Sequence, residues 1–423
     1  MKTYIMRKNY IWLILLLVIY LIAVILMNKP LKGDELRYLA YAENLTQGFY
    51  TDSENPDLSN GPGYPIVLLP FVVIGSNLLF AKLLNAIFVF IGICFLYETL
   101  LFYTNQKYAL LIVLLVGLYP PLLRWMPVLY SESLSFLLVC GFLFYFCSLY
   151  RIKKNWKSVI LASLCLGFLV LTKVVFFHVI VVSIIALTIL LLVKRKKSPK
   201  WALYVAIGAF IVTSPFLIYA YSVTGKIFYL GTRGGEILYH RATPFENEYG
   251  NWFSPDKILG LDNDPSNENL KLLISNHKEF YSQVMPLSNM QRDSVFKTKA
   301  IENMKAYPTK YFKNTIANAS RFLFNGPNSY QSEDLNDFGY IIPNGVIMVL
   351  SVLLVWPAFL SRKKIPFEVK AALWFSLIYG TGMILLLGKP RYFIMMVPPL
   401  VLFLVYGYSH ILKISGVREK QKS

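Results

Sequence analysis

Long apolar runs constrain this chain more than any other feature. Several stretches hold about 18 or more mostly apolar residues, the length that an α-helix needs to cross a hydrocarbon layer roughly 30 Å thick. Because no water in that layer can satisfy backbone N–H and C=O groups, each such stretch must be helical. The sequence therefore predicts an all-α integral membrane protein.

The runs predict a polytopic bundle of about ten transmembrane helices. They lie at approximately residues 10–27, 78–103, 108–122, 132–150, 158–172, 174–193, 201–223, 343–360, 368–387 and 392–412. Two long connections, residues 28–77 and 224–342, are predicted to be extracytoplasmic loops that carry juxtamembrane helices. The chain thus divides into an N-terminal membrane module (1–223), the long loop (224–342) and C-terminal membrane helices with a basic tail (343–423).

Composition excludes several other classes of protein. Hydrophobic residues make up 56% of the chain and charged residues only 15%, which excludes a disordered chain and an ordinary soluble domain. The net charge of +19 would suggest nucleic-acid binding in a soluble protein, but here it fits attraction to membrane lipids instead. All four cysteines fall inside apolar runs, so we expect no disulfide framework.

The distribution of charge predicts the orientation in the membrane. Basic clusters occupy residues 151–154, 194–197 and 362–364 and the tail after Lys413. Of the 23 acidic residues, six lie in residues 34–57 and thirteen in residues 236–337. The positive-inside rule then places both termini in the cytoplasm and the two long loops outside a plasma or inner membrane. The basic head and long apolar run at the N-terminus predict an uncleaved first span.

Asp34 and Glu35 follow the first span within a few residues. A carboxylate at the membrane surface can act as a general base, with a pKa raised by partial desolvation. Asp34 could also hold a divalent cation together with a second carboxylate such as Glu132. The alternative is that these acids are ordinary solvated loop residues.

Charged residues near the predicted outer ends of other spans are a second group of candidates. Glu132 begins the fourth span, where an acid is costly unless it has a function or faces a helix N-terminus. Arg124, Lys173, Lys389 and Arg391 lie at the same predicted membrane level. Arginine and lysine bind phosphate well, so their convergence predicts a phosphate site. Snorkelling toward lipid head groups is the alternative for each cation alone.

Other motifs carry little chemistry. The triplet at residues 262–264, Asp-Asn-Asp, resembles the metal-binding triplet of nucleotide-sugar transferases, but the following Pro265 predicts a turn. The four histidines are scattered without ligand-like spacing, and the sequence has no phosphate-binding or dinucleotide-binding glycine motif. A nucleotide-dependent enzyme is therefore not expected.

The order of short motifs resembles the GT-C superfamily of polytopic glycosyltransferases. The Asp-Glu pair after the first span, Tyr38, residues 61–65 (Gly-Pro-Gly-Tyr-Pro), residues 130–133, 306–311 and 390–392, and Pro398-Pro399 occur in the same order in such proteins. The sequence is most similar to bacterial members related to protein O-mannosyltransferases and to the aminoarabinose transferases of lipid A.

The resemblance implies a sugar donor carried on a polyprenyl phosphate and an acceptor glycan, lipid or protein. It implies catalytic roles for Asp34 and Glu35. It also implies substrate binding by Glu132, Arg124, Lys173, Lys389, Arg391, Tyr392 and Tyr64. The resemblance does not imply a definite cofactor. A divalent metal ion held by Asp34 and Glu132 is the candidate.

We therefore predict a membrane glycosyltransferase that works on the extracytoplasmic face. Nucleotide sugars are not expected on that face, so a lipid-linked donor is needed there. Two alternatives have different signatures: a transporter or flippase of lipid-linked glycans needs a polar path across several spans, and a non-enzymatic envelope assembly protein needs no intact charged site.

Overall fold

The computed structural model describes residues 2–194, 198–260, 268–330 and 337–412 of the 423-residue chain. Within these ranges the regular structure is helical and no strand occurs. The predicted basic cluster at 194–197, the tail after Lys413 and the triplet at 262–264 lie wholly or mainly outside the described residues.

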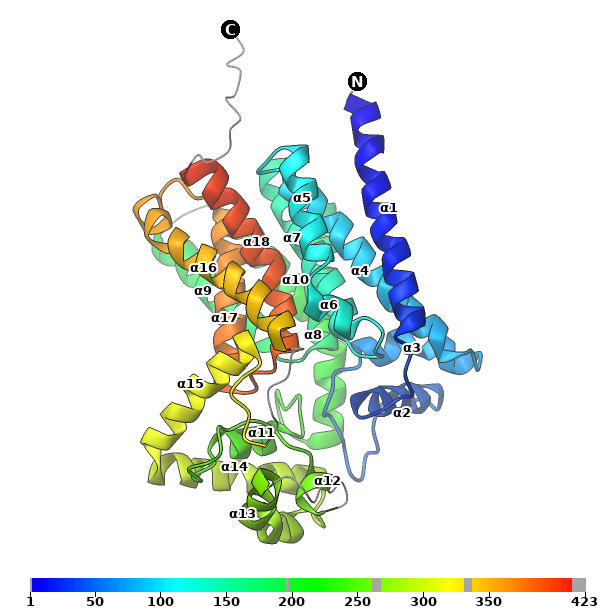
Figure 1. The fold of residues 1–423 in the computed structure, drawn as a ribbon, viewed down its shortest axis with the longest axis vertical. Coiled ribbons are helices and arrows are strands. Elements are labelled where there is room, and N and C mark those ends of the chain that lie inside the picture. Colours follow the sequence, from blue (N-terminus) through cyan, green and yellow to red (C-terminus); the bar gives the residue numbers. More distant parts are fainter. Residues whose placement is uncertain (1, 195–197, 261–267, 331–336, 413–423) are drawn as a thin grey trace.

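A bundle of long apolar helices forms the main body (Figure 1). Its members are α1 (Lys2–Leu26), α4 (Leu78–Leu100), α5 (Gln106–Gly117), α7 (Glu132–Arg151), α8 (Trp156–Thr172), α9 (Phe176–Lys194), α10 (Pro199–Thr224), α16 (Phe338–Leu360), α17 (Phe367–Leu385) and α18 (Val397–Tyr406). Among the described residues six helical segments are long and apolar enough to cross a membrane, and shorter apolar helices accompany them. The predicted all-α membrane bundle is confirmed.

One span differs from the prediction because of proline. The run expected at 108–122 is the short helix α5, followed by a break and the small helix α6 (Pro120–Trp125). Pro120 and Pro121 lack the N–H groups that would continue the helix. The last span begins as a 3₁₀ segment, η2 (Pro390–Met396), before α18, and ends in the π-helical turn η3 (Gly407–Ile411).

Small residues allow the helices of the bundle to pack closely. A Cβ on Gly92 of α4 would lie 2.8 Å from the Phe136 ring of α7, and one on Gly167 of α8 would lie 2.6 Å from Val212 of α10. Close helix approach at small residues is typical of membrane bundles.

Shorter helices gather at the end of the bundle opposite the two termini (Figure 1). The first loop supplies α2 (Asp34–Thr46) and α3 (Gly63–Val73). The long loop supplies α11 (Gly234–Arg241), α12 (Pro255–Ile258), α13 (Glu268–Val284), α14 (Asn289–Ala306) and α15 (Pro308–Phe324). Its helices enclose a separate apolar core that includes Tyr239, Phe253, Tyr281 and Phe296. The long loop is therefore a folded helical unit rather than an extended connection.

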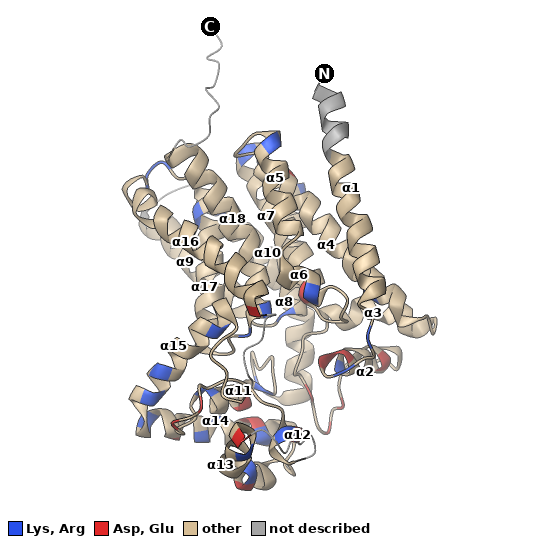
Figure 2. Ribbon diagram, in the orientation of Figure 1, with Lys and Arg blue, Asp and Glu red and all other residues tan. Residues whose placement is uncertain are grey.

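Charge divides between the two ends of the bundle. Figure 2 shows Lys and Arg at the loops near the termini, where residues 151–154 and 362–364 lie, and most acidic residues at the opposite end. We refer to these as the terminal end and the site end.

Candidate functional site

Four charged side chains from distant segments meet at the site end. Arg391 Nη2 lies 3.0 Å from Asp34 Oδ2, and Arg391 Nε lies 3.3 Å from Glu132 Oε1. Lys173 Nζ donates to the same Glu132 oxygen at 3.1 Å. Glu132 and Arg391 are buried, with side chains 2% and 9% exposed. Arg391 therefore joins two carboxylates that lie almost a hundred residues apart in the sequence.

Helix ends place these charges where the backbone favours them. Asp34 and Glu132 lie in the first turns of α2 and α7, where the positive end of the helix dipole stabilises a carboxylate. Lys173 follows the last residue of α8, at the negative end of that helix. The predicted hairpin turn between two apolar halves is present here, because α9 begins three residues later at Phe176.

The segment at residues 60–65 positions two of the charged groups. Arg37 pairs with Asp34, and its Nε donates to Asn60 Oδ1 at 2.6 Å. A Cβ on Gly61 would lie 2.1 Å from the Leu171 carbonyl oxygen, and one on Gly63 would lie 2.5 Å from Thr172 Oγ1. Only glycine fits against the end of α8, so this segment fixes both Arg37 and the turn that presents Lys173.

Tyr64 and Glu35 lie in the packing around the site. Tyr64 is buried, its hydroxyl donates to Asn85 Oδ1 at 3.1 Å, and its ring meets Tyr38 edge-on. Glu35 is buried as well, and its two oxygens accept from the backbone N–H groups of Lys32 at 3.0 Å and Leu129 at 2.9 Å. These contacts suit residues that position α2 better than residues that touch a reacting group.

Aromatic rings surround the cations. The Arg391 guanidinium lies 4.6 Å from the Tyr130 ring centre, 5.1 Å from that of Trp125 and 5.2 Å from that of Tyr392. Lys173 Nζ lies 4.8 Å from the centre of the Tyr392 ring. Cation–π contact holds a cation without neutralising it, so the positive charge stays available to an anion.

A cavity of about 430 Å³ adjoins this group of charges. Five cations line it: Arg124, Lys257, Arg321, Lys389 and Arg391. Lys389 Nζ lies 4.2 Å from the centre of the Trp252 ring. We call this the Arg391 cavity. Its net positive lining and its size suit a phosphate group with part of a sugar.

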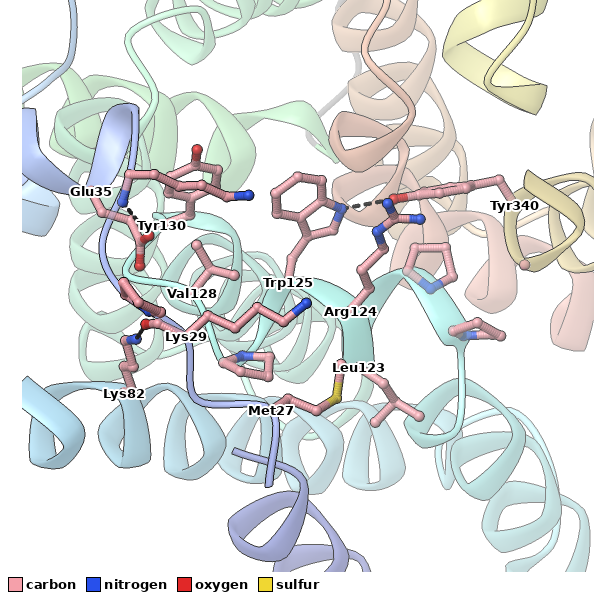
Figure 3. A pocket seen from close by; sticks show the side chains of 16 residues that line it. Met27, Lys29, Glu35, Lys82, Leu123, Arg124, Trp125, Val128, Tyr130 and Tyr340 are labelled. Atoms are coloured by element: carbon pink, nitrogen blue, oxygen red, sulfur yellow. Dashed lines mark hydrogen bonds between the residues drawn. The ribbon is translucent and has the colours of Figure 1, made fainter. Parts of the chain in front are cut away.

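A second cavity, of about 760 Å³, lies beside the first (Figure 3). Both cavities are lined by Arg124, Trp125, Tyr130 and Tyr340, which form the wall between them. Trp125 Nε1 donates to the Tyr340 hydroxyl at 2.9 Å, which closes part of that wall. The structure thus places Arg124 next to the charged group rather than inside it.

The protonation of Asp34 differs from the expectation. Burial raises its pKa, but the guanidinium groups of Arg391 and Arg37 and the ammonium of Lys389 outweigh that effect and hold the pKa well below its usual range. The expected rise through desolvation is therefore wrong. As paired here, Asp34 is an ionised hydrogen-bond acceptor. Burial and the nearby Arg391 lower the pKa of Lys389.

The carboxylates do not fit a divalent metal ion. Within the described ranges, no three His, Cys, Asp or Glu side chains lie close enough to hold one. Arg391 fills the space between Asp34 and Glu132, and Lys173 and Arg37 add further positive charge. The metal site expected from Asp34 and Glu132 is replaced by a guanidinium, because that cation already satisfies both acids.

Sequence reasoning missed the residues that tie the long loop to the site. Asn318 Nδ2 donates to the Ile384 carbonyl at 2.6 Å, and the Gly388 N–H donates to Asn318 Oδ1 at 3.0 Å. Arg321 Nη1 donates to the same amide oxygen at 3.0 Å. These contacts from α15 hold the loop that ends at Lys389. The polar face of α15, at residues 314, 318 and 321, is the sequence signal that could have revealed them.

Trp125, Tyr130 and Trp252 were also not predicted as site residues. Trp125 and Tyr130 adjoin the predicted Arg124 and Glu132 in the sequence, and that proximity could have suggested them. Trp252 lies in the long loop without a local pattern that sets it apart.

Comparison with known proteins agrees with this architecture. A family model described as dolichyl-phosphate-mannose-protein mannosyltransferase matches residues 61–219. No curated protein sequence matches the chain at a significant level.

Three solved structures show similarity to the chain. The archaeal oligosaccharyltransferase AglB from Archaeoglobus fulgidus, in complex with an inhibitory peptide and a dolichol-phosphate, is 14% identical, with a TM-score of 0.50 over 97% of this chain and 52% of AglB. Its apo form has a TM-score of 0.50 at 13% identity over 95% of this chain and 51% of that one. ArnT from Cupriavidus metallidurans, bound to undecaprenyl phosphate, has a TM-score of 0.42 at 12% identity over 94% of this chain and 78% of ArnT.

The chain spans about half the length of the AglB structures, so the likeness concerns the membrane fold. The chain is thus a polytopic helical membrane protein that is similar over residues 61–219 to the dolichyl-phosphate-mannose-protein mannosyltransferase family and shares its fold with the AglB oligosaccharyltransferase.

Proposed function

We propose that this protein transfers one sugar from a polyprenyl-phosphate carrier to a hydroxyl group of an acceptor on the extracytoplasmic face. The main support for this proposal is the position of Arg391. Its guanidinium is shared between Asp34 and Glu132 and lies at the edge of a cavity that Lys389 also lines. The basic loops of the terminal end support a cytoplasmic location for both termini.

The cations suit the leaving group of such a reaction. When the bond between the anomeric carbon and the phosphate oxygen breaks, that oxygen keeps the electron pair and the phosphate gains negative charge. Arg391 and Lys389 line the cavity and carry preorganised positive charge that stabilises it. Lys173, which is paired with Glu132, orients that carboxylate and supports Arg391 from the other side.

Asp34 suits the attacking hydroxyl. Its carboxylate accepts the proton of the acceptor hydroxyl as the hydroxyl oxygen bonds to the anomeric carbon. The donor phosphate competes with Asp34 for Arg391, and weakening of that ion pair raises the proton affinity of Asp34. Binding of the donor thus makes a weak base stronger at the moment when a base is needed.

Transfer by the purified full-length protein in liposomes tests this function. The donor probe is a synthetic polyprenyl-phosphate hexose with a labelled sugar, and an extract of envelope glycans and lipids supplies the acceptor. We expect Asp34→Asn to lower transfer by about 100-fold or more. The matched control is Glu54→Gln, which removes an exposed carboxylate from the same loop.

Two results contradict the proposal. Full transfer by the Asp34→Asn variant would show that Asp34 is not the base. Movement of the labelled carrier across the bilayer without a new glycosidic bond would instead identify a flippase.

A further inference from the structure

The 760 Å³ cavity holds four cations that the proposed transfer step does not use. They are Lys29, Lys32, Lys82 and Arg124. Figure 3 shows Lys29 extending across the cavity toward Arg124, with Lys82 close to the Lys29 backbone. We call this the Lys82 cavity.

Among the described residues, no carboxylate pairs with Lys82. The residue lies in the second turn of α4, is only 3% exposed, and donates to Asn28 Oδ1 and to the Lys29 carbonyl, both at 2.8 Å. Both acceptors are neutral. Two neutral acceptors leave the buried positive charge uncompensated, so an anion bound nearby would stabilise it.

The other three cations are also without an acidic partner. Among the described residues, no Asp or Glu oxygen lies within 4.0 Å of the charged nitrogens of Lys29, Lys32 or Arg124. Glu35 is the one carboxylate that lines the cavity, and both of its oxygens accept backbone N–H groups. Four cations against one carboxylate leave the cavity with a net charge of +3.

The rest of the lining is mainly apolar. Met27 at the end of α1, Leu123, Val128 and prolines 30, 120, 121 and 127 supply these walls. A cavity with a strongly positive part and apolar walls, next to helix ends of a membrane bundle, matches an amphiphile with an anionic head group. Snorkelling does not explain Lys82, because its ammonium is buried against the chain instead of reaching water.

We infer that the Lys82 cavity is a second anion site, which binds the phosphate-ester head group of an amphiphilic ligand separate from the sugar donor. The wall of Trp125 and Tyr130 separates this ligand from Arg391, while Tyr130 lines both cavities. The Tyr130 hydroxyl lies beside Gly33, the residue before Asp34. One further step rests on the proposed function. In that case the ligand is a phosphate-bearing acceptor whose hydroxyl reaches Asp34 where the two cavities meet at Tyr130.

A binding experiment on the full-length protein in neutral detergent tests the site. The probe is dioctanoyl phosphatidic acid, with dioctanoyl phosphatidylcholine and inorganic phosphate as comparison ligands, measured by isothermal titration. We expect saturable binding of phosphatidic acid and about tenfold or greater weakening in Lys29→Gln/Lys32→Gln, since each lost charge-assisted contact removes affinity. These two lysines are exposed, so the double variant should fold.

The matched control is Lys153→Gln/Lys154→Gln, which removes two exposed lysines at the terminal end. Equal binding by the Lys29/Lys32 variant and the wild type would overturn the site. If phosphatidylcholine bound as tightly as phosphatidic acid, the site would not be specific for an anion. If inorganic phosphate bound as tightly as phosphatidic acid, the site would not require an amphiphilic ligand.

The Asp34→Asn variant separates this inference from the proposed function. It should bind phosphatidic acid as the wild type does while it loses transfer. Retained transfer would contradict the proposed function and leave the binding result unaffected.

Discussion

The bundle contains a contact between a buried glutamate and an arginine at each end, and the two contacts differ in their charge balance. At the terminal end, Glu368 of α17 pairs with Arg151 of α7 at 2.7 Å, and the Tyr103 hydroxyl donates to the same oxygen at 3.2 Å. The Arg151 guanidinium also lies 4.5 Å from the centre of the Tyr103 ring. One acid meets one arginine, and their neighbours satisfy them.

At the site end, cations outnumber acids. Asp34 and Glu132 share Arg391, while Arg37 and Lys173 add contacts and Lys389 stands in the adjoining cavity. A balanced pair locks two helices together. An unbalanced group beside a cavity leaves positive charge that a bound anion can satisfy. This difference supports the proposal that transfer takes place at the site end.

Removal of Arg391 should have the largest effect. Arg391→Gln leaves the buried Glu132 and Asp34 without their shared cation and takes a guanidinium from the leaving phosphate. We expect transfer to fall about 100- to 1,000-fold, measured as turnover per folded molecule. Arg151→Gln at the terminal end is the control. If both variants lost turnover equally, the contrast between the ends would fail.

A methyl group at Gly61 should have the next largest effect. Gly61→Ala drives a Cβ against the Leu171 carbonyl, 2.1 Å away, and a backbone atom cannot move aside as a flexible side chain can. The end of α8 and Lys173 must shift, so we expect about a tenfold loss of transfer. Gly345→Ala, where no atom lies within 4 Å of the added Cβ, should remain active. Normal turnover in Gly61→Ala would show that the α8 turn does not set the site.

Glu368→Gln should change stability and not activity. The Glu368 side chain is 4% exposed, but Arg151 is 31% exposed and solvent screens the pair, so we expect a loss of about 1–2 kcal/mol. Thermal unfolding in detergent measures it, with a transfer assay at a temperature where both proteins are folded. Turnover that dropped with Glu368→Gln would mean that the terminal end also takes part in function.

The pH dependence of stability should show the smallest effect. The pKa of Asp34 in the folded protein lies below its ordinary value of 3.8, so the ionised group stabilises the fold above about pH 4, and this contribution is lost as the pH falls through the folded pKa. The stability advantage of the wild type over Asp34→Asn should be constant from pH 7 to about pH 5 and shrink below about pH 4. An advantage that shrinks already between pH 7 and pH 5 would indicate a raised pKa instead.

Much of the fold could be predicted from the sequence. The apolar runs marked the bundle helices, and the turn between the spans expected at 158–172 and 174–193 occurs at Lys173. The break before Pro120 shortened the span expected at 108–122, since proline acts through local hydrogen bonds that a hydropathy pattern does not contain.

The candidate site could be predicted only in outline. Asp34, Glu132, Lys173 and Arg391 were expected at one level of the membrane, and the structure brings them into contact. The depressed pKa of Asp34 was not foreseen, because its value depends on which cations lie within a few ångströms. The sequence also did not predict that both carboxylate oxygens of Glu35 would accept hydrogen bonds from backbone N–H groups.

By itself the sequence determined that the chain is a helical membrane bundle with most of its acidic residues at one end, because hydrophobic length and charge placement act segment by segment. Only the tertiary structure decided which cation meets which carboxylate, that a guanidinium stands where a metal ion was considered, and that two cavities share one aromatic wall. Electrostatic and packing energies depend on distances between residues that lie far apart in the chain, and those distances exist only once the chain has folded.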